Sequence, residues 1–100
     1  MIFVIIGYDG LDGPTKRTEH RQAHLDRIAS LNKAEKVILA GPFTDGAGSL
    51  IVIEADSLKD AQAFASHDPY VTQGVFSRYE VHPFMQVYPA ATTSVHHDAT

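Results

Sequence analysis

The sequence predicts an α+β protein in which four strands form one antiparallel sheet and two helices cover one face of it. Apolar, β-branched stretches and stretches of helical period follow one another in the order βαββαβ. Clusters of Gly, Pro, Asp and Asn separate most of these stretches, as expected for turns. The length of 100 residues suits a single domain with a small core.

The first strand is expected over residues 2–8, which form a continuous β-branched and aromatic run. Because such a run is apolar on both faces, both faces of the strand are expected to be buried. A turn follows, and Pro14 suits the first position of a helix that runs to Asn32. No Gly or Pro closes this helix, so Asn32 is expected to take the left-handed cap.

The first helix has two different faces. Its apolar stripe is formed by Leu25, Ile28 and Leu31. His24 stands one turn before Ile28, so it borders the stripe that is expected to be buried. The opposite, solvated face is expected to consist of Lys16, Arg17, Glu19 and Arg21.

The remaining elements follow at short intervals. Strands are expected over residues 37–40, 50–55 and 77–88, and the second helix over residues 58–67. Gly41 and Pro42 are expected to end the second strand, and Ser57 to cap the second helix. Pro83 cannot donate a ladder hydrogen bond, so it indicates an edge strand or a bulge in the last strand.

Asp68 stands where the second helix has to stop. Pro69 disfavours the α conformation for the residue before it, so this helix is expected to end near Asp68. A carboxylate there lies at the negative end of the helix dipole, which opposes it by roughly 0.3–1 kcal/mol when exposed. Asp68 also continues the inward face of the helix, so we expect it to have a partner, and His24 is the partner we predict.

Two helices cover only one face of a four-stranded sheet, yet two of the strands are apolar on both faces. An uncovered second face would expose a larger apolar patch than monomers usually tolerate. The simplest cover is a second copy packed sheet to sheet, so the pattern predicts a homodimer. The order βαββαβ is that of the ferredoxin-like split unit, over residues 1–88, and residues 89–100 are expected to be a C-terminal tail.

Composition argues against several classes of function. The formal net charge is −4 and the basic residues are scattered, which argues against nucleic acid as a partner. The chain has no cysteine, which excludes disulfides, thiolate metal sites and a cysteine nucleophile. The apolar residues 2–6 are too short to span a bilayer and lack the basic flank of a signal peptide, so no membrane partner and a cytoplasmic location are expected.

Short motifs occur in a fixed order along the chain. They are Arg21-x-x-His24-Leu25, Ala40-Gly41-Pro42, Gly48-Ser49, Asp56-Ser57-Leu58-x-x-Ala61, Asp68-Pro69-Tyr70-Val71-x-x-Gly74-Val75-Phe76 and Val81-x-Pro83-Phe84. From Met1 to about Tyr88 this set resembles the YciI family (YCII-related domain). Glu35 departs from the pattern, because the family commonly has Gly there, and this puts the turn after the first helix in question.

The resemblance implies a ferredoxin-like fold that pairs into a dimeric α+β barrel. It also implies a His/Asp site, which maps onto His24 and Asp68. One branch of the family is associated with dehydrochlorination of chlorinated hydroxyhydroquinones in aromatic breakdown. The wider barrel superfamily contains lactone isomerases and cofactor-free monooxygenases.

The chemistry of a histidine–carboxylate pair agrees with such a site. A carboxylate on one ring nitrogen fixes the tautomer, so the other nitrogen can act as a general base near neutral pH. Gly41 and Ser49 are expected to line the pocket and to offer donors to a developing oxyanion. Tyr70 is expected to close the pocket, and Arg21 to attract an anionic group of a small-molecule substrate.

Each of these residues also has a purely structural interpretation. His24 can bond a backbone carbonyl, and Asp68 can cap a nearby amide. Tyr70 can serve packing alone, Arg21 can be a solvated helix residue, and Gly41 can be a turn glycine.

A metal site is the third interpretation of His24. His20 and His24 stand four residues apart, the spacing of two metal ligands on one helix face. The helix lacks the Glu of the zincin pattern, and Arg21 beside the pair disfavours a cation, so neither a metal nor a cofactor is expected. His96 and His97 in the tail are assigned no role.

Two functions from different classes remain. The first is a cofactor-independent lyase or isomerase acting on a small cyclic or aromatic-derived compound, with His24 as the base and Asp68 as the group that orients it. The second is a dimeric module that binds a small molecule, or supports another protein, without turnover. They differ first in geometry, because only the enzyme requires the two side chains to meet at a pocket.

Overall fold

The computed structural model describes residues 1–90, in which four strands and three helices occur. They are β1 (Ile2–Asp9), α1 (Gly13–Lys33), β2 (Val37–Pro42), β3 (Gly48–Glu54), α2 (Leu58–Ser66), α3 (Pro69–Thr72) and β4 (Phe76–Phe84). Residues 91–100, with His96, His97 and most of the expected tail, lie outside the described part. Within residues 1–90, none of the helices has the length and apolar character that a membrane crossing requires.

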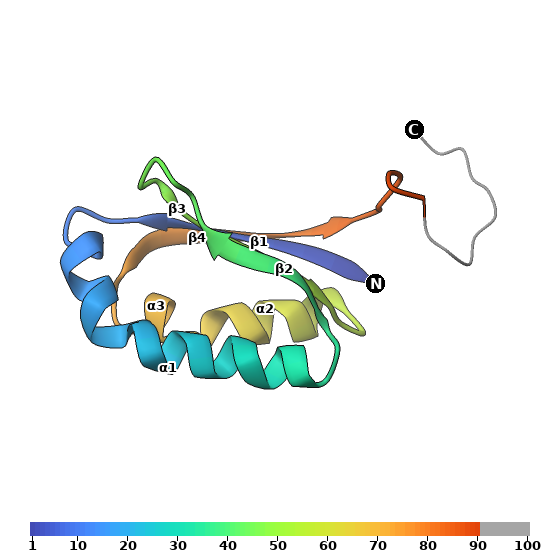
Figure 1. Cartoon of the computed structure of the whole chain (residues 1–100), viewed down its shortest axis with the longest axis horizontal. Helices are drawn as coiled ribbons and strands as arrows, with labels where there is room; N and C mark the ends of the chain where they lie inside the picture. The colour runs from blue at the N-terminus through green and yellow to red at the C-terminus, as the bar shows by residue number, and fades with distance from the viewer. Residues whose placement is uncertain (91–100) are drawn as a thin grey trace.

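The strands form one antiparallel sheet in the order β2-β3-β1-β4, and α1 and α2 lie side by side on one face of it (Figure 1). The predicted α+β class and the four-stranded antiparallel sheet are therefore confirmed. α3 is a single additional turn between α2 and β4. β4 is an edge strand, where Pro83 can stand without leaving an inner strand short of a donor.

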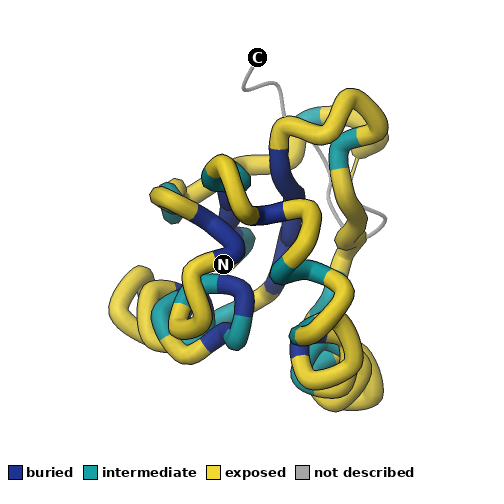
Figure 2. The backbone as a smooth tube through the Cα atoms, turned by 90° about the vertical axis from the view of Figure 1, so that its left-hand side faces the viewer, coloured by how far each residue is buried: buried dark blue, intermediate teal, exposed yellow. Residues whose placement is uncertain are grey.

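The core lies between the sheet and the helices. The two central strands alternate, and their helix-facing members Phe3, Ile5, Ile51 and Ile53 are buried against α2. α2 is closely packed because its own contact residues are small, Ala61 and Ala65. In Figure 2 the buried stretches accordingly lie mainly along the strands, whereas the helices are largely exposed.

The other face of the sheet carries no helix, and Figure 1 shows it open. The register puts Val4 opposite Val52 and Ile6 opposite Leu50 on that face, with the neighbouring Leu39 opposite Val52 from the other side. We call this the open face; its apolar members are Ile2, Val4, Ile6, Leu39, Leu50, Val52 and Phe84. Strands 1 and 3 are thus apolar on both faces, as the sequence predicted.

The apolar stripe of α1 is less buried than expected. Leu25 is 46% exposed, Ile28 and Leu31 are only partly buried, and His24 is the one buried residue of the helix besides Gly13. The reason is geometric, since a hollow separates this stripe from the β2 side of the sheet. Leu25 and Ile28 line this cavity, whereas Ile28 and Leu31 also pack against the edge of the core.

The end of α1 differs from the prediction in which residue turns left-handed. Asn32 stays helical, and Glu35 takes a positive φ of 62°. The amide of Glu35 donates to the carbonyl of Asn32 and that of Lys36 to Leu31, which is the Schellman pattern of hydrogen bonds. The position where the resembling family commonly has Gly is therefore the one whose backbone favours Gly.

Two strand ends also differ from the sequence-based expectation. β2 ends at Pro42, two residues after the expected Ala40, and Gly41 and Pro42 pair with Leu50 and Ser49 as part of the strand. Pro42 is tolerated because β2 is the other edge strand and this is its last residue. β4 ends at Phe84, four residues before the expected end.

Candidate functional site

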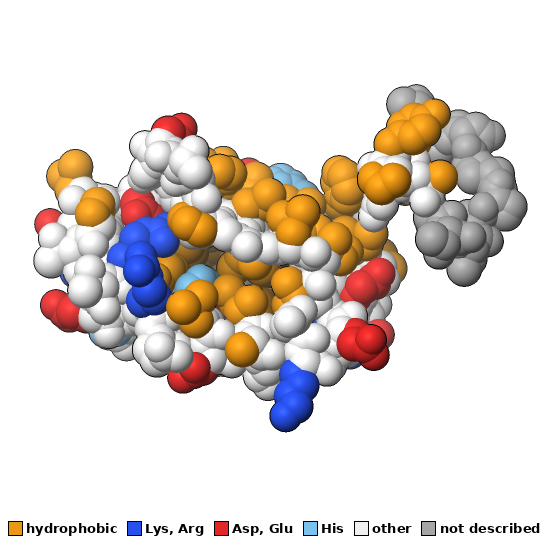
Figure 3. Space-filling model, viewed as in Figure 1, with side chains coloured by type: hydrophobic (Ala, Val, Ile, Leu, Met, Phe, Trp, Pro, Cys, Tyr) orange, Lys and Arg blue, Asp and Glu red, His pale blue; other side chains and the backbone are white. Residues whose placement is uncertain are grey.

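A cavity of about 370 Å³ opens between α1 and the β2–β3 side of the sheet. Figure 3 shows this hollow with hydrophobic side chains around it and Lys or Arg side chains at one end. The residues that line it come from α1, the two strands and α3: Arg17, Arg21, His24, Leu25, Ile28, Ala40, Gly41, Pro42, Ser49, Ile51 and Tyr70. All the site residues expected from the sequence line it except Asp68, which lies behind His24.

His24 and Asp68 form a buried pair beside this cavity. His24 Nδ1 lies 2.8 Å from Asp68 Oδ1 and 2.9 Å from Oδ2, and the two residues are 6% and 2% exposed. A carboxylate can only accept, so Nδ1 donates and the lone pair of the neutral ring is on Nε2. Arg27 Nη1 lies 3.6 Å from Oδ2 and donates to the carbonyl of Phe64, which places a positive charge behind the acid.

The local sequence explains how Asp68 reaches this position. Pro69 keeps Asp68 extended, with φ −68° and ψ 134°, and this ends α2 and starts α3. Asp68 Oδ1 accepts the amide hydrogen of Tyr70 at 2.8 Å, so the acid is the N-cap of α3. The carboxylate therefore lies at the favourable, positive end of α3, and the expected conflict with the dipole of α2 is offset. The same carboxylate therefore caps α3 and pairs with His24.

The ring of His24 is fixed by stacking as well as by the hydrogen bond. Its centroid lies 3.8 Å from that of Tyr70, with 6° between the planes. Tyr70 itself is buried and meets the edge of Phe76 at 5.5 Å and 84°. The Tyr70 ring thus forms part of a rigid wall of the cavity, placed beside the imidazole.

Arg17 is a cavity residue that the sequence analysis placed wrongly on the solvated face of α1. Its side chain is 14% exposed, and Nε and Nη2 donate to the two oxygens of Asp9 at 2.7 and 2.9 Å. Nη2 also donates to the hydroxyl of Ser49 at 2.9 Å. The hydrogen bond to Asp9 is the main cause that raises the pKa of Arg17 above its ordinary value, so the guanidinium keeps its charge.

The signal that could have located Arg17 is Asp9, an acid directly after a buried apolar strand. Such an acid needs a cation, and α1 supplies one from its second turn. Gly13 makes room for the pair, because a Cβ there would lie 2.8 Å from the Cβ of Asp9. Helical periodicity does not reveal this contact, because it describes one helix and not the strand that approaches it.

The other expected site residues lie at different depths. Ser49 is buried, and its hydroxyl accepts from Arg17. Gly41 offers the cavity only backbone, and a side chain there would meet open space, so packing within one chain does not require glycine. Arg21 is exposed at the mouth and forms none of the hydrogen bonds or ion pairs found among residues 1–90. Within the same range, no cluster of three or more His, Cys, Asp or Glu suits a metal ion.

Comparison with known proteins gives consistent matches over most of the chain. A model of the YCII-related domain matches residues 1–85. Protein YciI of Escherichia coli O6:H1 is 38% identical over 98 residues, which cover 88% of this chain and all of that protein. An uncharacterized protein of Haemophilus influenzae is 31% identical over 101 residues with the same coverage.

A solved structure shares the fold. It is the 5-chloro-2-hydroxyhydroquinone dehydrochlorinase TftG from Burkholderia phenoliruptrix AC1100, in complex with 2,5-dihydroxybenzoquinone. The TM-score is 0.79, and the likeness covers 91% of this chain and 100% of that one, at 24% sequence identity. At this level of identity the likeness shows the fold alone.

Proposed function

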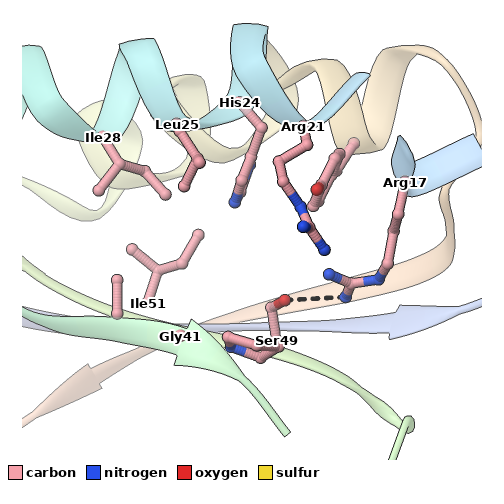
Figure 4. A pocket seen from close by; sticks show the side chains of 11 residues that line it. Arg17, Arg21, His24, Leu25, Ile28, Gly41, Ser49 and Ile51 are labelled. Carbon is pink, nitrogen blue, oxygen red and sulfur yellow. Dashed lines mark hydrogen bonds between the residues drawn. The ribbon is translucent and has the colours of Figure 1, made fainter. Parts of the chain in front are cut away.

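The chain belongs to the YCII-related domain family, and we propose that it is a cofactor-independent enzyme of the YciI type. Its reaction would be that of a lyase or an isomerase, a proton transfer on a small cyclic or aromatic-derived compound. The observation that carries this proposal is the buried His24–Asp68 pair beside the cavity. In Figure 4 the His24 side chain points from α1 into that cavity, as a general base requires.

Each residue of the pair has a distinct part in the proposed step. In a dehydrochlorination of a chlorinated hydroxyhydroquinone, His24 Nε2 takes the proton of a ring hydroxyl and delivers it to the carbon that bears chlorine. A second hydroxyl then loses its proton, the C–Cl bond breaks to release chloride, and a hydroxyquinone remains. In an isomerisation, Nε2 removes the proton from one carbon and returns it to another through an enolate. In both reactions Asp68 stabilises the imidazolium and keeps the ring in its tautomer.

Negative charge on a substrate oxygen develops in either reaction and needs donors. Ser49 and the backbone at Gly41 lie on the sheet side of the cavity, and Arg21 lies at its mouth. We propose that these three bind the substrate, with the ring of Tyr70 as the wall that keeps His24 in place.

The size and character of the cavity suit a single-ring substrate. About 370 Å³ is near the lower end of ligand pockets, which run from roughly 300 to 1,000 Å³. Leu25, Ile28 and Ile51 provide apolar walls, and the polar groups converge at one end. The fold neighbour TftG is by its description a dehydrochlorinase of a hydroxyhydroquinone and binds a dihydroxybenzoquinone, and this supports the class of compound we propose.

The proposal is tested with chlorinated hydroxyhydroquinones and enol-lactones as candidate substrates. Chloride release and the ultraviolet spectrum of the product would follow turnover. We expect His24→Ala to lower kcat by about 10²–10⁴-fold, with an unchanged circular dichroism spectrum. A wild-type protein that turns over no compound of a broad panel would contradict the enzyme.

One observation favours the second candidate, a module that binds a small molecule without turnover. Asp68 caps α3 and His24 stacks on Tyr70, so the pair also has a purely structural use in holding α1 to α3. If this were its whole role, His24→Ala would lower stability and leave ligand binding intact in an inert wild type.

We further propose that the domain spans residues 1–88 and acts as a homodimer. The open face supports the pairing, because no helix of residues 1–90 covers its apolar side chains.

A further inference from the structure

We infer that the cavity binds its substrate as a singly charged oxyanion on a planar ring, held between Arg17 and Arg21. The inference rests on the proposed function and names the substrate class of the same site. Three features carry it: the charge balance of the cavity, the unused donors of Arg17, and the row of side chains along α1.

The charge balance leaves one positive charge. Two arginines and no acid line the cavity. Asp9 neutralises Arg17 through two hydrogen bonds. Asp68, behind His24, is balanced by Arg27 at 3.6 Å. Arg21 has no acidic partner among residues 1–90. Although the whole chain has a formal net charge of −4, the charges at the cavity sum to one positive charge. The cavity therefore favours an anion, and a ligand with one negative charge neutralises it.

Arg17 supplies a rigid half of the anion site. Its hydrogen bonds in the described part of the chain involve Nε and Nη2, which leaves the two N–H groups of Nη1 for a ligand. Asp9 and Ser49 already hold the guanidinium, so binding costs little side-chain entropy. A preorganised guanidinium is well suited to an oxyanion, since charge-assisted hydrogen bonds are about twice as strong as neutral ones.

Arg21 supplies the mobile half. It stands four residues after Arg17 on the same face of α1, and Figure 4 shows both guanidinium groups pointing toward the space above Ser49. Exposure at the mouth lets Arg21 fold over a bound anion and close its open side.

His24 continues the same row, three residues after Arg21. Three residues correspond to about 4.5 Å along a helix axis, which is close to the width of one six-membered ring. A ring whose oxyanion lies at the arginines therefore has a carbon near His24 Nε2. The anion also serves the chemistry, because an ionised oxygen conjugated with that carbon donates electron density to it as the carbon takes up a proton from His24 or loses chloride.

The experiment measures binding of matched charged and neutral rings by NMR titration of the full chain. One pair is benzoate and benzamide, and the other is 2-hydroxy-1,4-benzoquinone, ionised at neutral pH, and 2-methoxy-1,4-benzoquinone. The two pairs distinguish a carboxylate from a ring enolate as the source of the oxyanion. We expect the anion to bind at least about tenfold more tightly than its neutral partner in one pair or both.

The variants are Arg21→Gln and, as a matched control, Lys33→Gln, which removes the same charge from the exposed end of the same helix. Arg21→Gln should remove most of the preference for the anion, and Lys33→Gln should keep it. Arg17→Lys, which retains a charge beside Asp9, should weaken anion binding as well.

Equal binding of the charged and neutral rings overturns the inference, as does no detectable binding of any anion at millimolar concentration. A preference for the anion that survives Arg21→Gln also overturns it. Failure of the proposed function has a different signature. An anion preference in a protein without turnover supports the inference and contradicts the enzyme, whereas His24-dependent turnover of neutral rings supports the enzyme and contradicts the inference.

Discussion

Asp68 connects two parts of the molecule through one carboxylate. Oδ1 accepts from the amide of Tyr70 and lies 2.8 Å from His24 Nδ1, so the group that starts α3 also orients the imidazole. The two roles need different properties of the side chain. The cap needs an acceptor of the right length, whereas a developing imidazolium needs a negative charge.

Substitutions of Asp68 can therefore separate the roles. We expect Asp68→Asn to retain the cap and to cost about 1–2 kcal/mol of stability, while turnover falls about 10³–10⁴-fold. Asp68→Ala also loses the cap and leaves Arg27 without its acid, so a cost of about 3–5 kcal/mol is expected. Urea unfolding measures the stability and substrate assays measure the turnover. An Asp68→Asn protein with wild-type turnover would show that the acid has no chemical role.

Asp68 and His24 could be predicted as site residues from the sequence, whereas Arg17 could not. Pro69 marks a helix stop and Asp68 continues an inward face, so an acid in need of a partner was predictable. His24 on the border of an apolar stripe was the suitable partner, and the structure brings them together. Arg17 was missed because its environment depends on Asp9, which belongs to a strand that the helix pattern does not describe.

At the scale of elements, the link between α1 and β2 holds an unusual residue. Glu35 has φ 62° within a complete Schellman arrangement, where Gly is the common residue. For an L residue with a Cβ this conformation costs roughly 1–2 kcal/mol. The family resemblance put this turn in question, but the sequence favoured Asn32 rather than Glu35 for the positive φ, since the choice depends on where β2 begins its pairing.

We expect Glu35→Gly to stabilise the protein by about 0.5–1 kcal/mol. Relief of the backbone strain exceeds the additional entropy that glycine brings to the unfolded chain, which is roughly 0.5–1 kcal/mol. Thermal unfolding would show the gain as a rise of about 2–8 °C in Tm. Asn32→Gly is the matched control, because Asn32 is helical and glycine there should lower the Tm. A Tm that falls in Glu35→Gly would contradict the strain argument.

At the scale of the whole molecule, the sheet separates two unlike surfaces. One face is packed by α2 and borders the cavity under α1, and the other is the open face. The continuous apolar runs of β1 and β3 predicted both surfaces, because such strands are apolar on each side. The depth of the cavity was beyond the sequence, since it depends on how far α1 stands from β2.

The open face is not uniform, and this determines where a second copy would pack. Arg78, Glu80 and His82 follow one another along β4, with Glu80 bonded to both neighbours at 2.7 and 2.8 Å. These hydrogen bonds, first that of His82, hold the pKa of Glu80 below its usual range, so this edge stays charged. Over β2, β3 and β1 the face is apolar, and a groove there is lined by residues that include Leu39, Val52 and Val4, with Phe84 of β4 at its far side. A sheet-to-sheet contact is therefore expected to centre on the β2 side.

This contact predicts that a single charge on the β2 side makes the protein monomeric. Leu39 is 52% exposed in one chain, so Leu39→Asp should leave the fold intact while placing an unpaired charge in the dimer contact. Sedimentation should give about twice 10.9 kDa for the wild type and 10.9 kDa for the variant. Leu58→Asp is the control, because Leu58 is also exposed but lies on the helix side of the sheet, and it should remain dimeric. A wild-type monomer would mean that the open face is tolerated bare in water or covered by something other than a second copy, and that the cavity is complete within one chain.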